Sequence, residues 1–274
     1  MSTEPRPLVS FLTDFGDRDP WAAICRGVVL ALAPEARLLD ISHSVGKYDV
    51  REGAYLLWCA LPYLPVGIHV AVVDPGVGTA RRPIAISTGR GDVLVGPDNG
   101  LLLPAAERLD GKREVRLLAN PAQRLPTVSA SFHGRDIFAP VAGHLAAGEP
   151  FESVGPVLDP GSLVPLAWPA AAVEPGRIST AVLYVDTFGN VKLAAGRVET
   201  VSAFGERPGG WLEVHAGDAA PIRVPWRSTF GEVDPGDAVV YLDSFDRLCL
   251  AVDQGSAAER FGLAEDVLVV VRRA

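Results

Sequence analysis

The sequence predicts two domains: an α/β N-terminal domain with a central, mostly parallel sheet, and a C-terminal all-β barrel domain. In the first half, strand patterns alternate with helix patterns, which is the rhythm of right-handed crossovers in a parallel sheet. In the second half, short strand patterns are separated by turn residues, which favours a small barrel or sandwich. We expect the α/β domain at residues 1–168, a Pro/Gly-rich linker from about 152 to 177 and the barrel at residues 178–274.

The composition limits the classes of partner and compartment. Of the 274 residues, 48% are hydrophobic and 21% are charged, which suits an ordinary packed core. The net charge of −8 argues against nucleic acid as the main partner, because phosphate binding needs a basic face. Cys25, Cys59 and Cys249 are odd in number and far apart, so a reducing compartment is expected. With no signal-peptide pattern and no apolar run of about 18 residues, we expect a cytoplasmic protein without membrane contact.

The elements of the first domain follow from apolar patterns and turn residues. Residues 8–13 have the pattern of a buried strand, and residues 21–32 form a helix because Pro20 suits the first helical turn. Residues 83–87 and 92–95 form a strand pair around the turn at residues 89–91. The other elements expected here are strands at 37–41, 70–74 and 114–118 and helices at 50–63 and 137–147.

The second domain consists mainly of short strands. A helical turn is expected at residues 256–261, and no other helical period of ordinary length is evident beyond the linker. The strands are expected at residues 179–185, 191–193, 211–215, 222–224, 238–241, 247–252 and 267–271.

The stretch at residues 70–82 is the strongest indication of a functional site. It begins as a buried strand, places Asp74 at the strand's carboxyl end, continues through a Gly-rich loop and reaches Arg81. Ligands of open α/β sheets bind at the carboxyl ends of strands. The alternative is a structural Asp–Arg pair at an ordinary turn.

Two further aspartates follow the first strand. Asp14 lies at the strand end, where helix capping does not explain it, so a role in ligand binding is favoured. Asp19 stands just before Pro20, and capping of the helix at residues 21–32 explains it well.

His133 completes the set of candidate catalytic residues. It stands just before a helix in the segment Phe-His-Gly-Arg-Asp, and a structural role is the alternative. Asp74, Arg81 and His133 lack a good covalent nucleophile, but together they could position and polarise a water molecule. Asp40 with His43 is at most half of a metal site, and the histidines lack metal-ligand spacing, so we expect no metal.

Six motifs in order along the chain resemble the S-adenosylmethionine hydroxide adenosyltransferases, the hydrolase relatives of the fluorinases and chlorinases. They occupy residues 12–20, 73–82, 96–100, 132–136, 186–190 and 253–255. The resemblance spans nearly the whole chain. It implies a homotrimer in which the first domain of one subunit meets the second domain of its neighbour around S-adenosylmethionine (SAM).

The resemblance also implies a reaction and a set of site residues. Water or hydroxide attacks the ribose C5′ of SAM and releases adenosine and L-methionine, with SAM as substrate and no cofactor. Asp74, Arg81 and His133 match the catalytic residues of the hydrolases. Asp14 would hold the ribose hydroxyls, and Asp19 the methionine end. The remaining substrate-binding residues implied are Asp186, Phe188 and Asn190 around the adenine and Ser244 at the methionine carboxylate or amine.

Two other functions remain open. A halogenase would use the same pocket with chloride or fluoride, but its relatives carry tyrosine at the position of Asp74 and no arginine matching Arg81. A sensor would bind adenosine or SAM without turnover. Phe245 follows Ser244 where the fluorinase type has arginine, so the partner of the methionine carboxylate is left open.

Overall fold

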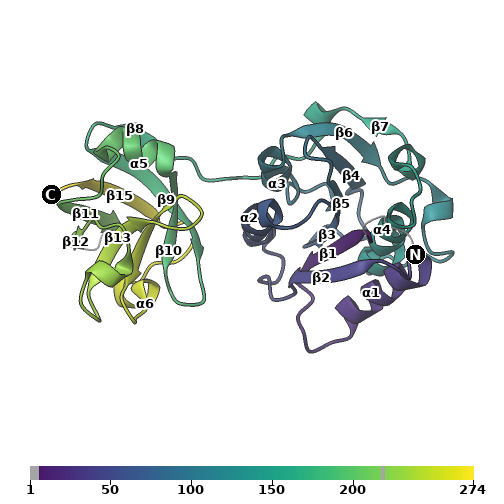
Figure 1. Cartoon of the computed structure of the whole chain (residues 1–274), viewed down its shortest axis with the longest axis horizontal. Helices are drawn as coiled ribbons and strands as arrows, with labels where there is room; N and C mark the ends of the chain where they lie inside the picture. The colour runs from purple at the N-terminus through teal and green to yellow at the C-terminus, as the bar shows by residue number, and fades with distance from the viewer. Residues whose placement is uncertain (1–5, 217–219) are drawn as a thin grey trace. The chain divides into compact units, whose positions relative to one another are not determined.

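The computed structural model describes residues 6–216 and 220–274, and it divides into two compact units with the boundary between Ala167 and Trp168 (Figure 1). The first unit contains a seven-stranded sheet in the order β2-β1-β3-β5-β4-β6-β7. Its strands are β1 (Leu8–Thr13), β2 (Arg37–Ser42), β3 (Ile68–Val72), β4 (Pro83–Thr88), β5 (Val93–Pro97), β6 (Lys112–Leu117) and β7 (Val157–Leu158).

The first sheet is mixed, whereas the sequence predicted a mostly parallel one. The ladders among β2, β1, β3 and β5 are parallel, and those among β5, β4, β6 and β7 are antiparallel. The expected turn at residues 89–91 explains the change, because a tight turn can only join antiparallel strands. The parallel half therefore supplies the strand ends at which a ligand site is expected.

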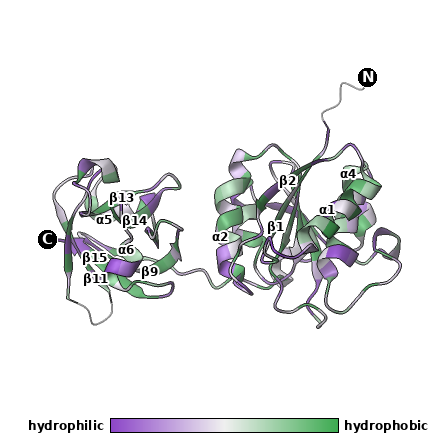
Figure 2. Cartoon of the chain, turned by 90° about the horizontal axis from the view of Figure 1, so that it is seen from below, coloured by the Kyte–Doolittle hydropathy of each residue, from purple (hydrophilic) through white to green (hydrophobic). Residues whose placement is uncertain are grey.

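Helices cover both faces of this sheet. In Figure 1, α2 and α3 lie on one face and α1 and α4 on the other, and Figure 2 shows hydrophobic residues concentrated between them. The helices are α1 (Trp21–Leu32), α2 (Val50–Ala60), α3 (Leu103–Arg108) and α4 (Ala139–Ala146), with a π-helical turn, η3 (Gly134–Phe138), and 3₁₀ turns η1 (Leu61–Tyr63), η2 (Pro121–Gln123), η4 (Phe151–Val154) and η5 (Pro160–Ser162).

One expected helix cap is wrong. The N-cap of α1 is Pro20, and no side chain accepts a hydrogen bond there, so Asp19 does not cap this helix. By contrast, Asp49 caps α2 by accepting a hydrogen bond from the Glu52 N–H at 2.8 Å. Capping therefore does not account for Asp19, which is exposed.

The second unit is an antiparallel sheet that nearly closes into a barrel, in the order β12-β11-β15-β9-β10-β14-β13 with β8 paired to β9. A bridge between Trp226 and Val240 links its two edge strands, and Trp226 is buried in the core. The strands are β8 (Ala172–Glu174), β9 (Arg177–Val185), β10 (Val191–Gly196), β11 (Trp211–Ala216), β12 (Ile222–Pro225), β13 (Ala238–Leu242), β14 (Arg247–Val252) and β15 (Leu268–Arg273).

Two features of the second half differ from the sequence-based expectation. The segment expected as a linker contributes β7 to the first sheet and β8 to the second. The helix α5 (Arg197–Phe204) was not expected, because its β-branched residues have low helix propensity. Glu199 accepts a hydrogen bond from the Gly196 N–H at 2.9 Å and fixes its start. The expected helical turn is α6 (Ala257–Phe261), and a 3₁₀ turn, η6 (Phe230–Glu232), precedes β13.

The described residues also bear on the cysteines and on membranes. Cys25, Cys59 and Cys249 are buried and free. In the part of the chain that the structure describes, every helix is too short or too polar to cross a bilayer.

Candidate active site

The loop after β3 brings Asp74 and Arg81 together. Arg81 donates from Nε to Asp74 Oδ1 at 3.1 Å and from Nη2 to Asp74 Oδ2. Both side chains are nearly buried, with exposed fractions of 7% for Arg81 and 4% for Asp74. Gly78 makes this loop possible, because its φ of +76° suits glycine and an added Cβ would lie 2.3 Å from the Ala130 carbonyl oxygen.

His133 joins this pair from the start of η3. Arg81 Nη2 lies 2.9 Å from His133 Nδ1. Since a guanidinium can only donate, Nδ1 must accept, and the proton of the neutral imidazole is on Nε2. Burial, followed by the Arg81 cation, lowers the pKa of His133 below its ordinary value, so the ring is held neutral. The three predicted catalytic residues are therefore one connected network.

The network borders a cavity of about 250 Å³ in the first unit. Asp74, His133 and Asp14 line it, whereas Arg81 is not among the described lining residues and reaches the cavity through its two partners. In this arrangement Arg81 contacts the two groups that face the cavity, Asp74 and His133. The other lining residues are Phe15, Tyr48, Val72, Val77, Ser131, Phe132 and Gly134.

Asp14 is fixed in this wall by the loop after β2. Its Oδ2 accepts a hydrogen bond from the Tyr48 N–H at 3.0 Å, and its carbonyl oxygen accepts one from Lys47. Tyr48 has a φ of +66°, which is unusual for a bulky residue, and its side chain is 69% exposed beside the cavity. Sequence reasoning missed Tyr48, because no motif marks a residue in this conformation.

Carboxylates provide the charge in the cavity wall itself. Asp14 and Asp74 line the cavity, His133 is held neutral, and the cations Arg81 and Lys47 contact Asp74 and Asp14 but are not among the described lining residues. Carboxylates that face the cavity suit a positively charged ligand atom.

Asp19 does not share this cavity. It lines a separate depression beside α1, together with Asp17 and Arg26. Asp40 and His43 are also engaged elsewhere: His43 Nε2 lies 3.1 Å from Asp40 Oδ1, and Arg26 pairs with Asp40. Within the described ranges, three or more acidic, His or Cys side chains do not converge as metal ligands would.

Three predicted binding residues of the second unit lie together in a cavity of about 620 Å³. Asp186 Oδ1 accepts hydrogen bonds from the backbone N–H groups of Phe188 and Asn190, at 3.0 and 2.9 Å. This turn leaves the Phe188 ring 77% exposed. Phe230, which sequence reasoning missed, faces the same cavity and is 49% exposed. Exposed aromatic rings with an amide nearby suit a planar heterocycle.

Ser244 lines an adjoining cavity of about 290 Å³. Phe230 lines both cavities, so the two are neighbours at this residue. Sequence reasoning also missed Lys192, Tyr241 and Asp243 in this wall. Lys192 follows Asn190 by two residues on β10, and Asp243 directly precedes Ser244, so proximity to the motifs was the signal available.

Family models match both halves of the chain. The SAM hydroxide adenosyltransferase N-terminal domain matches residues 9–155, and the C-terminal domain of the same family matches residues 180–270. The chain belongs to the SAM hydroxide adenosyltransferase family.

Relatives and solved structures agree with this assignment. A protein of Salinispora tropica named (R)-S-adenosyl-L-methionine hydrolase is 46% identical over 94% of this chain and 95% of its own length. A fluorinase of Actinopolyspora mzabensis is more distant, at 30% identity over 98% of each chain. The crystal structure of an uncharacterized conserved protein from Thermotoga maritima has a TM-score of 0.90 and 33% identity, and the match covers 97% of this chain and 100% of that one.

Proposed function

We propose that this protein is a SAM hydrolase that forms adenosine and L-methionine. The observation that carries the proposal is the Asp74–Arg81–His133 network on the wall of an acid-rich cavity. The 46% identity to the Salinispora tropica protein named (R)-S-adenosyl-L-methionine hydrolase supports SAM as the substrate. The Asp14 and Asp74 carboxylates in the cavity wall suit the sulfonium of SAM.

The reaction needs activation of the nucleophile more than of the leaving group. The sulfur leaves with the electron pair of the C5′–S bond as a neutral thioether, so no general acid is required. A water oxygen forms the new bond to C5′ and loses one proton. In-line attack requires this oxygen at about 3–3.5 Å from C5′, opposite the sulfur.

The hydrogen-bond directions support one assignment of the group that accepts the proton from water. His133 accepts from Arg81 at Nδ1 and carries its proton on Nε2, so in this tautomer it orients water as a donor. Asp74 accepts two bonds from Arg81 and keeps carboxylate lone pairs for a third donor. We therefore propose that Asp74 takes the proton and passes it to solvent, while Arg81 stabilises the carboxylate and holds both partners.

The substrate-binding roles follow the family resemblance. We propose that Asp14 binds the ribose hydroxyls, since its carboxylate lines the cavity beside Asp74. Asp19 is proposed at the methionine end. In the second unit, Phe188, Asn190 and Asp186 are proposed around the adenine and Ser244 at the methionine group, because these four residues line the two adjoining cavities. SAM is the substrate, and we propose that no cofactor or metal takes part.

We further propose that the protein works as a homotrimer in the cytoplasm, with each site formed between subunits. The exposed rings of Phe188 and Phe230 support this, because isolated domains rarely leave such aromatic surface uncovered beside a cavity. Light scattering during gel filtration should give a mass three times that of the chain. A monomer that hydrolyses SAM would contradict the trimeric site.

The activity is tested by incubating purified protein with SAM in H₂¹⁸O and analysing products by mass spectrometry. We expect L-methionine and adenosine with one ¹⁸O at the 5′ oxygen. Parallel reactions with chloride or fluoride test the halogenase alternative, for which 5′-halo-5′-deoxyadenosine would be the product. Binding of SAM without turnover would favour the sensor alternative.

A further inference from the structure

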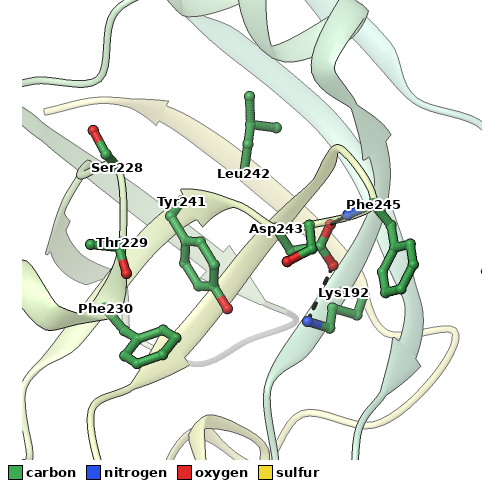
Figure 3. Close-up of a pocket in the computed structure, with 9 residues that line it drawn as sticks. Lys192, Ser228, Thr229, Phe230, Tyr241, Leu242, Asp243 and Phe245 are labelled. Carbon is green, nitrogen blue, oxygen red and sulfur yellow. Dashed lines mark hydrogen bonds and ion pairs between the residues drawn. The ribbon is translucent and has the colours of Figure 1, made fainter.

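The cavity around Ser244 contains a buried lysine, Lys192, which Figure 3 shows paired with Asp243. Lys192 projects from β10, and its Nζ lies 3.2 Å from Asp243 Oδ2 and 3.4 Å from Asp186 Oδ2. Its side chain is 10% exposed. An ammonium has three N–H donors, so two carboxylates leave one donor for a further acceptor.

The two carboxylates are fixed by their own loops. Asp243 Oδ1 accepts hydrogen bonds from the backbone N–H groups of Phe245 and Arg247, both at 2.9 Å. Its Oδ2 is buried and faces Lys192 without a well-aligned hydrogen bond. Asp186 is held by the turn that presents Phe188. Neither acid is free to move away, so Lys192 is held in the wall of the cavity around Ser244.

The charges of this cluster do not balance. Burial alone would lower the pKa of Lys192, but the neighbouring Cys249, Asp243 and Asp186 outweigh it and the net shift is upward, so the amine stays charged. Burial raises the pKa of Cys249 behind it to about 12, so that thiol is neutral. Two carboxylates and one ammonium leave one excess negative charge.

A mixed set of charges beside hydroxyl groups fits a zwitterion. The excess negative charge at Asp186 and Asp243 suits an ammonium, while the third donor of Lys192 suits a carboxylate. Among the described residues that line this cavity, Lys192 provides the only positive charge, and Ser228, Thr229 and Ser244 provide hydroxyl groups. A volume of about 290 Å³ is sufficient for the amino-acid end of a ligand.

We propose that Lys192 is the specificity-determining residue for the α-carboxylate of the substrate, in the cavity where Ser244 is already proposed to bind the methionine group. The proposal rests on the proposed SAM hydrolysis and adds the residue that selects the amino-acid group. The alternative is that Lys192 only neutralises Asp186 and Asp243 in the folded protein. The two roles differ in one measurable way: only the first depends on the substrate's carboxylate.

The test compares SAM with decarboxylated SAM, in which hydrogen replaces the carboxylate. The quantity measured is the ratio of kcat/KM for the two substrates, from which the concentration of active enzyme cancels. We expect the wild type to prefer SAM, and Lys192→Gln to reduce that preference about tenfold or more. Lys192→Arg should retain part of it. Lys112→Gln, at a lysine paired with Glu107 on the surface of the first unit, is the control and should keep the wild-type ratio.

Two further arms keep the proposal falsifiable. If Lys192→Gln does not fold, Ser244→Ala serves instead, since Ser244 is exposed, and it should lower the ratio by several-fold. If the variant that folds keeps the wild-type ratio of kcat/KM for the two substrates, the proposal is overturned. If the wild type cleaves neither substrate, the hydrolase proposal fails. Calorimetry with L-methionine and 3-(methylthio)propylamine then tests the cavity alone, and equal affinities for both would overturn it.

Discussion

Two acid–arginine–histidine networks of the first unit, one centred on Asp92 and one on Arg81, have opposite arrangements. In one, Asp92 lies in the middle: it accepts from His69 Nε2 at 3.0 Å and from Arg90 Nε at 2.7 Å. In the other, Arg81 lies in the middle between Asp74 and His133. The same residue types are therefore connected in a different order.

The order decides what each network can do. Asp92 and His69 are 0% and 1% exposed. On the other side of the imidazole ring, Ser10 Oγ is hydrogen-bonded to His69 Nδ1 at 2.7 Å. Although this is a Ser–His–Asp series, its groups bond to one another inside the sheet, so we assign it to stability. With Arg81 in the middle, Asp74 and His133 each keep an edge toward the cavity. The difference shows that residue types alone do not identify a catalytic network.

Removing Arg81 from the Asp74–Arg81–His133 network, here called the cavity network, should have the largest effect on activity. Arg81→Met leaves Asp74 without its donors and His133 without the group that fixes its tautomer. We expect kcat for adenosine formation to fall about 10²–10³-fold. The rate is measured under SAM saturation, with thermal unfolding as the control for folding. A folded variant with near-wild-type kcat would contradict the catalytic role of this network.

The equivalent change in the buried network of His69, Asp92 and Arg90, here called the sealed network, should affect stability instead. Arg90→Gln leaves the buried Asp92 carboxylate with a weaker partner, which should lower the free energy of unfolding by about 3 kcal/mol. The folded fraction should keep kcat within about twofold. Urea unfolding and the activity assay together check this, and a large loss of kcat without a loss of stability would remove the distinction between the networks.

Acid should weaken the sealed network through Asp92. Burial opposes its ionisation, but hydrogen bonds from His69 and Arg90 outweigh burial and hold the pKa of Asp92 well below its ordinary value. Its contribution to stability is therefore complete above the unfolded pKa of about 4 and is lost as the pH falls below that value. Urea unfolding at pH 5, 4 and 3 should show this loss. In Asp92→Asn, this contribution to the dependence of the free energy of unfolding on pH should be absent.

The cavity network should determine the acid limb of activity. Because the pKa of His133 is lowered, the imidazole remains neutral as the pH falls through about 6.5, the ordinary value for histidine. We expect kcat to stay constant there and to decline only at lower pH. His133→Gln, whose amide can donate but does not titrate in this range, is the comparison. A decline centred at or above pH 6.5 in the wild type would be inconsistent with a neutral His133.

The smallest effect is expected at Asp19. Asp19→Ala should change the free energy of unfolding by less than about 0.5 kcal/mol, because Asp19 is exposed and caps no helix. Asp49→Ala is the matched control at a true cap, and it should cost about 1 kcal/mol. Under the proposed role at the methionine end, Asp19→Ala should raise KM for SAM. Thermal unfolding and the activity assay separate the two effects.

The sequence was most informative where local patterns determine structure. The strand at Leu8–Thr13 and the helix at Trp21–Leu32 are confirmed, because buried apolar runs and Pro20 act within a few residues. Helix α5 was missed because its residues favour a strand locally, and the capping contact of Glu199 decides against that preference.

The candidate site was predictable only in part, for a similar reason. Asp74 and His133 stand in recognisable motifs at element ends, and the structure brings them together through Arg81. Tyr48 and Lys192 were missed, because each reaches its cavity through a contact with a residue on another segment: Tyr48 with Asp14, and Lys192 with Asp243. Such contacts depend on tertiary packing rather than on local pattern.

The central claim is that Arg81 fixes His133 as a neutral ring with its proton on Nε2. Nitrogen-15 NMR of histidine-labelled protein at neutral pH measures this directly, with His133→Gln identifying the signal. The account predicts an unprotonated Nδ1 and a protonated Nε2. A proton on Nδ1, whether in the other neutral tautomer or in an imidazolium, would contradict it.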